Sequence, residues 1–200
     1  MTTPRTIPLV DLAWQHDRVA GAITEGLART FTASAYILGP DVDAFEHEFA
    51  DFIGTRHCVG VANGTDAIEL ALRGAGIGPG CEVVVPANTF VGTAEAVLRC
   101  GATLVLADCD PDHLLLDPEA VEARVTRRTR AIIPVHLYGQ MAPLAALQAL
   151  APADVVVLED AAQAQGARQD GAGPGTVGRA AATSFYPGKN LGAYGDAGAV

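Results

Sequence analysis

Short apolar runs alternate with helix-like patterns along most of the chain. The runs are nearly continuous and rich in β-branched residues, which is typical of strands that are buried on both faces of a sheet. The pattern predicts a strand that starts at Gly198 and six strands before it: His57–Ala62, Glu82–Pro86, Thr103–Ala107, Ala131–His136, Asp154–Leu158 and Thr183–Tyr186.

Helical periodicity fills the connections between the first five strands. The predicted helices are Thr65–Gly74, Phe90–Cys100, Pro118–Val125 and Pro143–Leu150. Two more are predicted before the sheet, at Leu12–Thr30 and Val42–Ile53. Strands that alternate with helices predict an α/β fold with a mostly parallel, doubly wound sheet.

Composition narrows the function classes. The 200 residues are 50% apolar and 18% charged, as in a folded domain, and the net charge of −10 disfavours nucleic acid as a partner. No apolar run approaches the roughly 20 residues of a membrane span. The first residues lack the apolar core of a signal peptide, so we expect a cytoplasmic protein.

The cysteines show no pattern that suggests a site, whereas the single lysine is a candidate for chemistry. The four cysteines have no CxxC spacing and the five histidines no ligand spacing, so we expect buried thiols in a reducing compartment and no metal site. Of the 13 basic residues, 12 are arginine and only Lys189 is lysine. Arginine cannot replace lysine where chemistry needs an amine that loses its proton, although chance survival explains a single lysine equally well.

Five polar or aromatic clusters follow the predicted strands, where open α/β sheets bind ligands. They are Asn63–Asp66, Ala87–Phe90, His136–Gly139, Glu159–Gln163 and Pro187–Lys189.

Each cluster has an ordinary and a functional interpretation. Gly64 and Thr65 begin a helix, as a simple cap or as a cup for a phosphate group. Phe90 suits core packing, or stacking on a flat cofactor ring. Glu159 and Asp160 end a buried strand, so a carboxylate there caps the next segment or pairs with a cationic ring nitrogen, and Gln163 could face the same ligand.

Two glycine-containing segments each allow more than one interpretation. Pro187-Gly188 predicts a turn that aims Lys189 into the mouth of the sheet, as a nucleophile or base; the alternative is a solvated loop lysine. Gly173-x-Gly175-x-x-Gly178 matches the dinucleotide fingerprint as a string. It lies well after its strand and no clear helix follows it, so a nicotinamide oxidoreductase is a distant alternative.

Together these segments resemble the DegT–DnrJ–StrS family of nucleotide-sugar aminotransferases, which depend on pyridoxal phosphate (PLP) and have aminotransferase fold type I. The resemblance runs from about Ile7 to Val200, and LEDAAQAQGA and SFYPGKNLGAYGDAGAV carry it most specifically. Further matching stretches are IPLVDL, LGPDVDAFEHEFADFIG, VANGTDAIELALR, VPANTFVGTAEAV and IIPVHLYGQMA.

The resemblance implies a role for each candidate residue. Lys189 would form the Schiff base and move the proton, and Asp160 would keep the pyridine nitrogen protonated. The other cofactor-binding residues would be Gly64, Thr65 and Ser184 at the phosphate, Phe90 stacked on the ring and Gln163 at the ring hydroxyl. The chain departs from the family at Gln165, where histidine is frequent, and at Ala197, where a second glycine is frequent.

The implied reaction is transfer of an amino group, expected from glutamate, to a nucleotide-linked keto-sugar for antibiotic, cell-wall or surface-polysaccharide sugars. One alternative is a PLP-dependent sugar dehydratase of the same family, although those members resemble this chain with histidine in place of Lys189. Another is a truncated, inactive or regulatory relative.

Family members are longer than 200 residues. We therefore expect residues 1–200 to hold an N-terminal segment and most of the PLP-binding large domain, without the smaller C-terminal domain. The resemblance also implies an interior, antiparallel seventh strand and, for the full-length protein, a homodimer.

Overall fold

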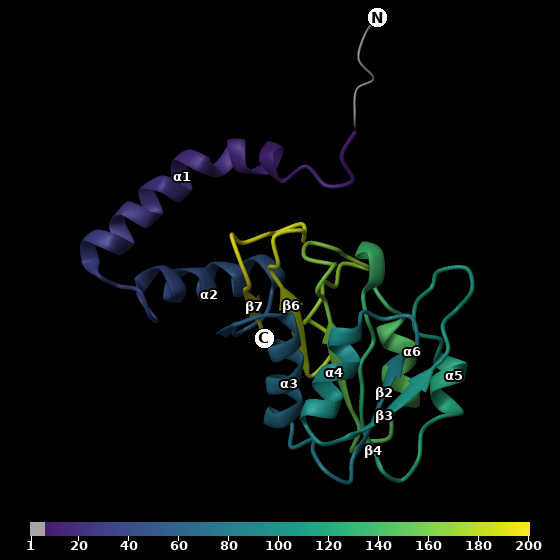
Figure 1. Cartoon of the computed structure of the whole chain (residues 1–200). Coiled ribbons are helices and arrows are strands. Elements are labelled where there is room, and N and C mark those ends of the chain that lie inside the picture. Colours follow the sequence, from purple (N-terminus) through teal and green to yellow (C-terminus); the bar gives the residue numbers. More distant parts are fainter. Residues whose placement is uncertain (1–6) are drawn as a thin grey trace, which may run out of the picture. The chain divides into compact units, whose positions relative to one another are not determined.

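The computed structural model describes residues 7–200, which form two compact units that meet within one helix, at Phe45 and Glu46. The first unit contains α1 (Leu12–Ala33) and the start of α2 (Pro40–Ile53) (Figure 1). Asp11 caps α1 by accepting a 3.1 Å hydrogen bond from the Trp14 N–H. No helix within residues 7–200 is both long and apolar enough to cross a membrane.

The second unit is built on a seven-stranded sheet in the order β1-β7-β6-β5-β4-β2-β3. The five strands from β2 to β6 are parallel, whereas β7 lies between β1 and β6 and is antiparallel to both. The strands are β1 (Gly60–Val61), β2 (Glu82–Pro86), β3 (Thr103–Ala107), β4 (Thr129–Ile132), β5 (Val156–Asp160), β6 (Ala180–Ser184) and β7 (Gly198–Ala199). The predicted interior, antiparallel seventh strand is confirmed.

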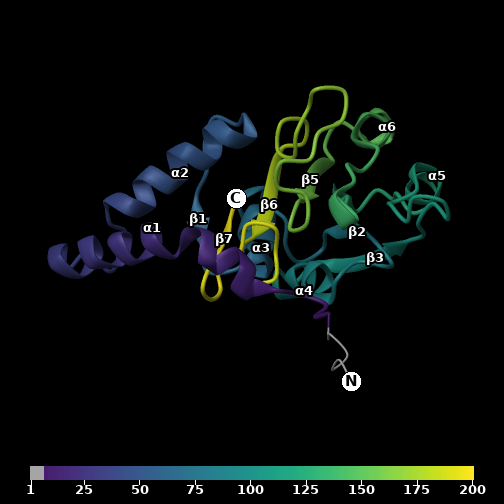
Figure 2. The same cartoon turned by 90° about the horizontal axis from the view of Figure 1, so that it is seen from above.

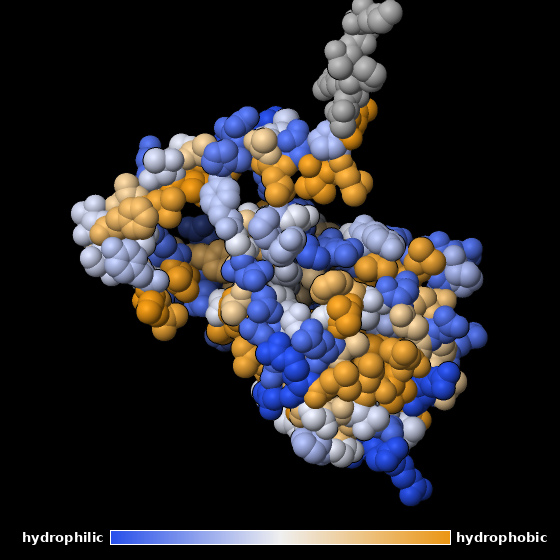
Figure 3. Space-filling model, viewed as in Figure 1, coloured by the Kyte–Doolittle hydropathy of each residue, from blue (hydrophilic) through white to orange (hydrophobic). Residues whose placement is uncertain are grey.

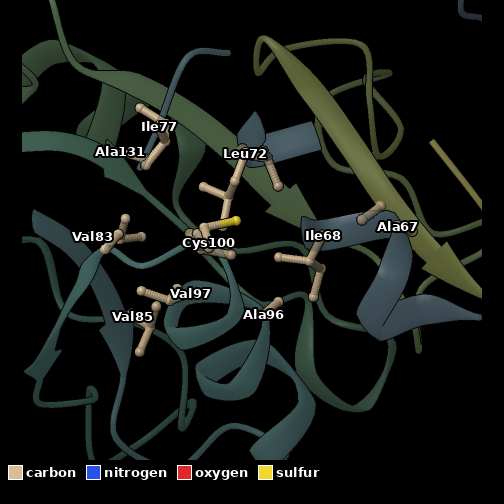
Figure 4. Packing of buried hydrophobic residues seen from close by; sticks show 14 residues of the cluster. Ala67, Ile68, Leu72, Ile77, Val83, Val85, Ala96, Val97, Cys100 and Ala131 are labelled. Atoms are coloured by element: carbon tan, nitrogen blue, oxygen red, sulfur yellow. The ribbon is translucent and has the colours of Figure 1, made fainter. Parts of the chain in front are cut away.

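Helices cover both faces of the sheet, as predicted for a doubly wound fold (Figure 2). On one face, α3 (Gly64–Gly74) and α4 (Val91–Arg99) pack over Val83 and Val85 of β2 (Figure 4). On the other face, α5 (Pro118–Glu122) and α6 (Leu144–Leu150) pack over Val84. Successive strand residues point to opposite faces, so a continuous apolar run supplies both cores.

The predicted elements are all present, but several strand ends differ, and the first strand is shortened from the predicted His57–Ala62 to Gly60–Val61. β4 ends at Ile132, four residues before the predicted end. Pro134 has no N–H to donate, so regular pairing with β5 does not continue, and an isolated bridge joins Val135 to Asp160. β6 starts at Ala180, three residues before the predicted start. Its alanines have weak strand propensity, so the pattern of apolar residues did not mark them.

The expectation of buried thiols holds fully only for Cys100, because Cys58, Cys81 and Cys109 are partly exposed. All four are free thiols. Burial, together with the nearby Glu46 carboxylate, raises the pKa of the Cys58 thiol to about 11. Burial also raises the pKa of Cys100 and Cys109. These thiols are therefore weak nucleophiles at neutral pH.

The glycines of the dinucleotide-like string hold an internal carboxylate. Glu159 is fully buried and accepts hydrogen bonds from the N–H groups of Gly175 (2.8 Å) and Gly178 (2.6 Å) and from Nε2 of His136 (2.8 Å). The Ala142 N–H donates to Nδ1 of His136 at 2.9 Å, so the ring proton is on Nε2. Glu159 is thus a structural acceptor, and Asp160 is the carboxylate of this pair that lines the cavity described below.

We expect Glu159→Gln to destabilise the intact protein. The substitution keeps the shape, but the new NH2 group faces donors that it cannot satisfy. Each buried donor without a partner costs about 1–3 kcal/mol. Denaturant unfolding measures the loss, with Glu122→Gln at the exposed end of α5 as the control. Equal stability of the two variants would contradict this account of the buried network.

Candidate active site

A cavity of about 710 Å³ opens at the carboxyl ends of the strands. It is lined by segments that follow β1, β2, β4, β5 and β6. All seven predicted site residues line it: Gly64, Thr65, Phe90, Asp160, Gln163, Ser184 and Lys189. The parallel strands bring together positions that lie up to 125 residues apart in the chain, from Gly64 to Lys189.

The N-terminus of α3 forms one wall of the cavity. Asn63 caps the helix by accepting a 2.9 Å hydrogen bond from the Asp66 N–H. A Cβ on Gly64 would lie 2.7 Å from the Cβ of Ser184, so only glycine allows this close approach. The Thr65 and Ser184 hydroxyls and the first N–H groups of an 11-residue helix therefore border the cavity together. This set of donors suits an anion such as a phosphate group.

Asp160 is a buried carboxylate without a cationic partner in the described part of the chain. Its side chain is 5% exposed. Its Oδ1 accepts from the Ala162 N–H at 3.1 Å, and its Oδ2 accepts from the Thr93 hydroxyl at 2.6 Å. Two hydrogen bonds use only part of the acceptor capacity of a carboxylate. A buried negative charge costs free energy unless a positive charge lies next to it, and a cationic group on a ligand would supply that charge. The residues present therefore fit a protonated ring nitrogen.

Gln163 and Phe90 present complementary groups to the cavity. The Gln163 Oε1 accepts from the Tyr138 N–H at 2.8 Å, which leaves Nε2, with no partner among residues 7–200, as a donor. Phe90 lines the cavity with its side chain 70% exposed. Core packing is therefore not its role, and the ring face is accessible for stacking on a flat ligand.

Lys189 follows the predicted turn. Its N–H donates to the Tyr186 carbonyl at 2.8 Å and closes the turn through Pro187 and Gly188. The Asn190 side chain donates to the Gln165 carbonyl at 2.8 Å, and the Gln165 side chain donates to the Ser184 carbonyl at 2.9 Å. Gln165 thus makes hydrogen bonds to both ends of the loop, at Ser184 and Asn190. The Lys189 amine forms no ion pair within residues 7–200 and lines the cavity.

The sequence reasoning missed Thr93, which is 1% exposed and contacts Asp160 directly. Threonine is uncommon as a fully buried residue, and Thr89 and Thr93 are four residues apart where a strand passes into a helix. No helix periodicity links the two residues, because Thr89 lies before α4, so the sequence carried no clear signal for the buried position of Thr93. Over residues 7–200, no group of three His, Cys, Asp or Glu side chains could hold a metal ion.

The fold and the cavity define the class of the protein, which has the mixed α/β fold with a mostly parallel sheet that PLP-dependent aminotransferases share. The chain belongs to the DegT/DnrJ/EryC1/StrS aminotransferase family, whose model matches residues 18–200. The resemblance predicted from the motifs is therefore confirmed.

Individual relatives agree with this assignment. The chain is 48% identical over 199 residues to the dTDP-3-amino-3,4,6-trideoxy-alpha-D-glucose transaminase of Streptomyces venezuelae, covering 99% of this chain and 52% of the relative. The crystal structure of S. venezuelae DesV in complex with a ketimine intermediate matches with a TM-score of 0.93 and 48% identity, over 98% of this chain and 53% of that one.

A third match bears on the cofactor. The structure of ntda from Bacillus subtilis, with the cofactor PMP bound, matches with a TM-score of 0.88 and 30% identity, over 99% of this chain and 45% of that chain. The chain thus spans about half the length of the relatives that it matches.

Proposed function

We propose that the intact protein is a PLP-dependent aminotransferase that moves an amino group to a nucleotide-linked keto-sugar. The observation that carries the proposal is the convergence on one cavity of Asp160, a buried carboxylate with no cationic partner among residues 7–200, and Lys189, the only lysine of the sequence. Support for the substrate class comes from the S. venezuelae relative, which is named as a transaminase of a dTDP-linked sugar. The proposed amino donor is glutamate.

In this proposal, different cavity residues bind different parts of the cofactor. Gly64, Thr65 and Ser184 bind the phosphate at the N-terminus of α3. Phe90 stacks on the ring, and the Nε2 of Gln163 donates to the ring hydroxyl. Asp160 pairs with the pyridine nitrogen and keeps it protonated. When bound, PLP acts as an electron sink for the substrate carbon to which the amine is attached.

Lys189 has two proposed roles. Its Nζ anchors the cofactor covalently between turnovers. The same Nζ would take a proton from one substrate atom and return it to another. The anchored turn that holds Lys189 keeps this amine at the cavity, which is what repeated proton transfer between fixed atoms requires.

We also propose that the intact protein is a cytoplasmic homodimer. Apolar side chains gather on the surface over α4 and β3 (Figure 3), where Val91, Leu98 and Leu106 are 65%, 59% and 49% exposed. Groups of exposed apolar residues of this kind mark association surfaces. Sedimentation of the intact protein tests the proposal, and a monomer at micromolar concentration would contradict it.

The proposed reaction is testable as two half-reactions. The intact protein loaded with PLP should convert L-glutamate to 2-oxoglutarate in an amount equal to its cofactor content. The product form should then aminate a dTDP- or UDP-linked keto-hexose, which mass spectrometry detects. If neither glutamate, glutamine nor alanine yields its keto acid, the proposed function is wrong.

A further inference from the structure

A hydrogen-bonded chain of two threonines leads to Asp160. The Thr93 hydroxyl lies 2.6 Å from Oδ2 of Asp160, and the Thr89 hydroxyl lies 2.9 Å from that of Thr93. Thr93 is 1% exposed and Asp160 is 5% exposed, whereas Thr89 is partly exposed at the cavity wall. The chain therefore runs from the cavity into the buried layer beneath it.

The donors in this chain have a defined direction. An ionised carboxylate only accepts hydrogen bonds, so the Thr93 hydroxyl donates to Asp160. With its single proton committed, the Thr93 oxygen accepts from Thr89. Hydrogen bonds in a row polarise one another, and a bond to a charged acceptor is stronger than a neutral one. The shorter of the two distances is the one to the carboxylate.

We propose that Thr93, supported by Thr89, is a positioning residue that fixes the rotation of the Asp160 carboxylate. The inference rests on the proposed function, because it assigns to Thr93 an effect on the cofactor through Asp160. One carboxylate oxygen is held by the Ala162 N–H at 3.1 Å and the other by Thr93 at 2.6 Å. The two donors hold both oxygens of a carboxylate that lines the cavity.

Packing alone does not require a hydroxyl at this position. The neighbouring inward residues of α4, Ala96 and Val97, are fully buried and apolar. Valine has nearly the shape of threonine, so a purely structural Thr93 would tolerate Thr93→Val. The Thr89–Thr93–Asp160 chain instead predicts that removal of the hydroxyl frees the carboxylate to rotate and leaves Thr89 without its acceptor.

The test compares Thr93→Val with Thr93→Ser in the intact protein loaded with PLP. Thr93→Val should slow the glutamate half-reaction about tenfold to a hundredfold, by analogy with residues that orient the ligands of a metal ion. It should also move the midpoint of the pH titration of the cofactor absorbance. Thr93→Ser retains the hydroxyl and should restore both values. Thr103→Val, at the exposed start of β3, is the matched control that should change neither.

A double-mutant cycle with Asp160→Asn separates this inference from the proposed function. If Thr93 acts through Asp160, Thr93→Val should have little further effect in the Asp160→Asn background. Equal rates and titration midpoints for Thr93→Val and the parent, or the same slowing in both backgrounds, would overturn the positioning role. Normal turnover in Asp160→Asn alone would refute the role assigned to Asp160, whereas a parent protein without any glutamate half-reaction would refute the proposed function. Thermal melts of each variant identify any loss of folding. If Thr93→Val does not fold, Thr93→Ser still tests the positioning role, because it keeps the hydroxyl and should retain the parent rate and titration midpoint.

Discussion

Lys189→Arg is expected to abolish amino transfer and covalent attachment of the cofactor. Arginine keeps the positive charge and most of the length, but its guanidinium does not lose its proton and cannot serve as the amine. Because Lys189 is the only lysine in the chain, no other side chain can replace it. Borohydride reduction of the PLP-loaded parent, followed by peptide mapping, should place the label on one peptide, and the variant should yield none.

The matched control adds an amine elsewhere. Arg124→Lys introduces a second lysine at an exposed position outside the cavity. The label should remain on Lys189 and turnover should be unchanged, which separates a specific site from general amine reactivity. A label on any other peptide of the parent, or turnover in Lys189→Arg, would refute the assignment.

Asp160→Asn is expected to lower turnover far more than it lowers affinity for PLP. The amide keeps the shape of the side chain but removes the negative charge that we place against the ring nitrogen. Loss of one well-placed electrostatic partner costs about a hundredfold to a thousandfold in rate. Stopped-flow absorbance gives the rate of the glutamate half-reaction, and equilibrium dialysis gives the Kd for PLP.

Asp112→Asn, in an exposed loop, removes the same charge away from the cavity and should leave both values unchanged. Near-normal turnover in Asp160→Asn would contradict the electronic role. A large loss of PLP affinity with turnover retained at saturating cofactor would show that Asp160 only helps to bind it.

The position of the cavity in the fold was predictable from the sequence, because the arrangement of parallel strands determines which residues meet. Parallel strands end at the same edge of the sheet, so the positions after each strand converge whatever their separation in the chain. Asp160 and Lys189 both follow that rule, and the structure brings them to one cavity. Their roles are not tested by the geometry and stay predictions.

Other features depend on neighbours that no local pattern specifies. Glu159 and Asp160 carry equivalent carboxylates at adjacent positions, and only the tertiary contacts of each one reveal that Glu159 is internal. The burial of Thr93 follows from the packing of α4 on the sheet, which polarity alone argues against. The shifted start of β6 reflects pairing with β5, which overrides the weak strand propensity of alanine.

The adjacency of Glu159 and Asp160 makes β5 unusually intolerant of length changes. Side chains alternate between the faces of a strand, so a slip by one residue turns both side chains to the opposite face. An insertion between Val156 and Glu159 moves Glu159 into the place of Asp160 and leaves the loop glycines and His136 without their acceptor. A deletion there moves Asp160 into the place of Glu159 and leaves the cavity without its charge. Comparable changes between Gln169 and Ala172, in an exposed turn, would affect neither.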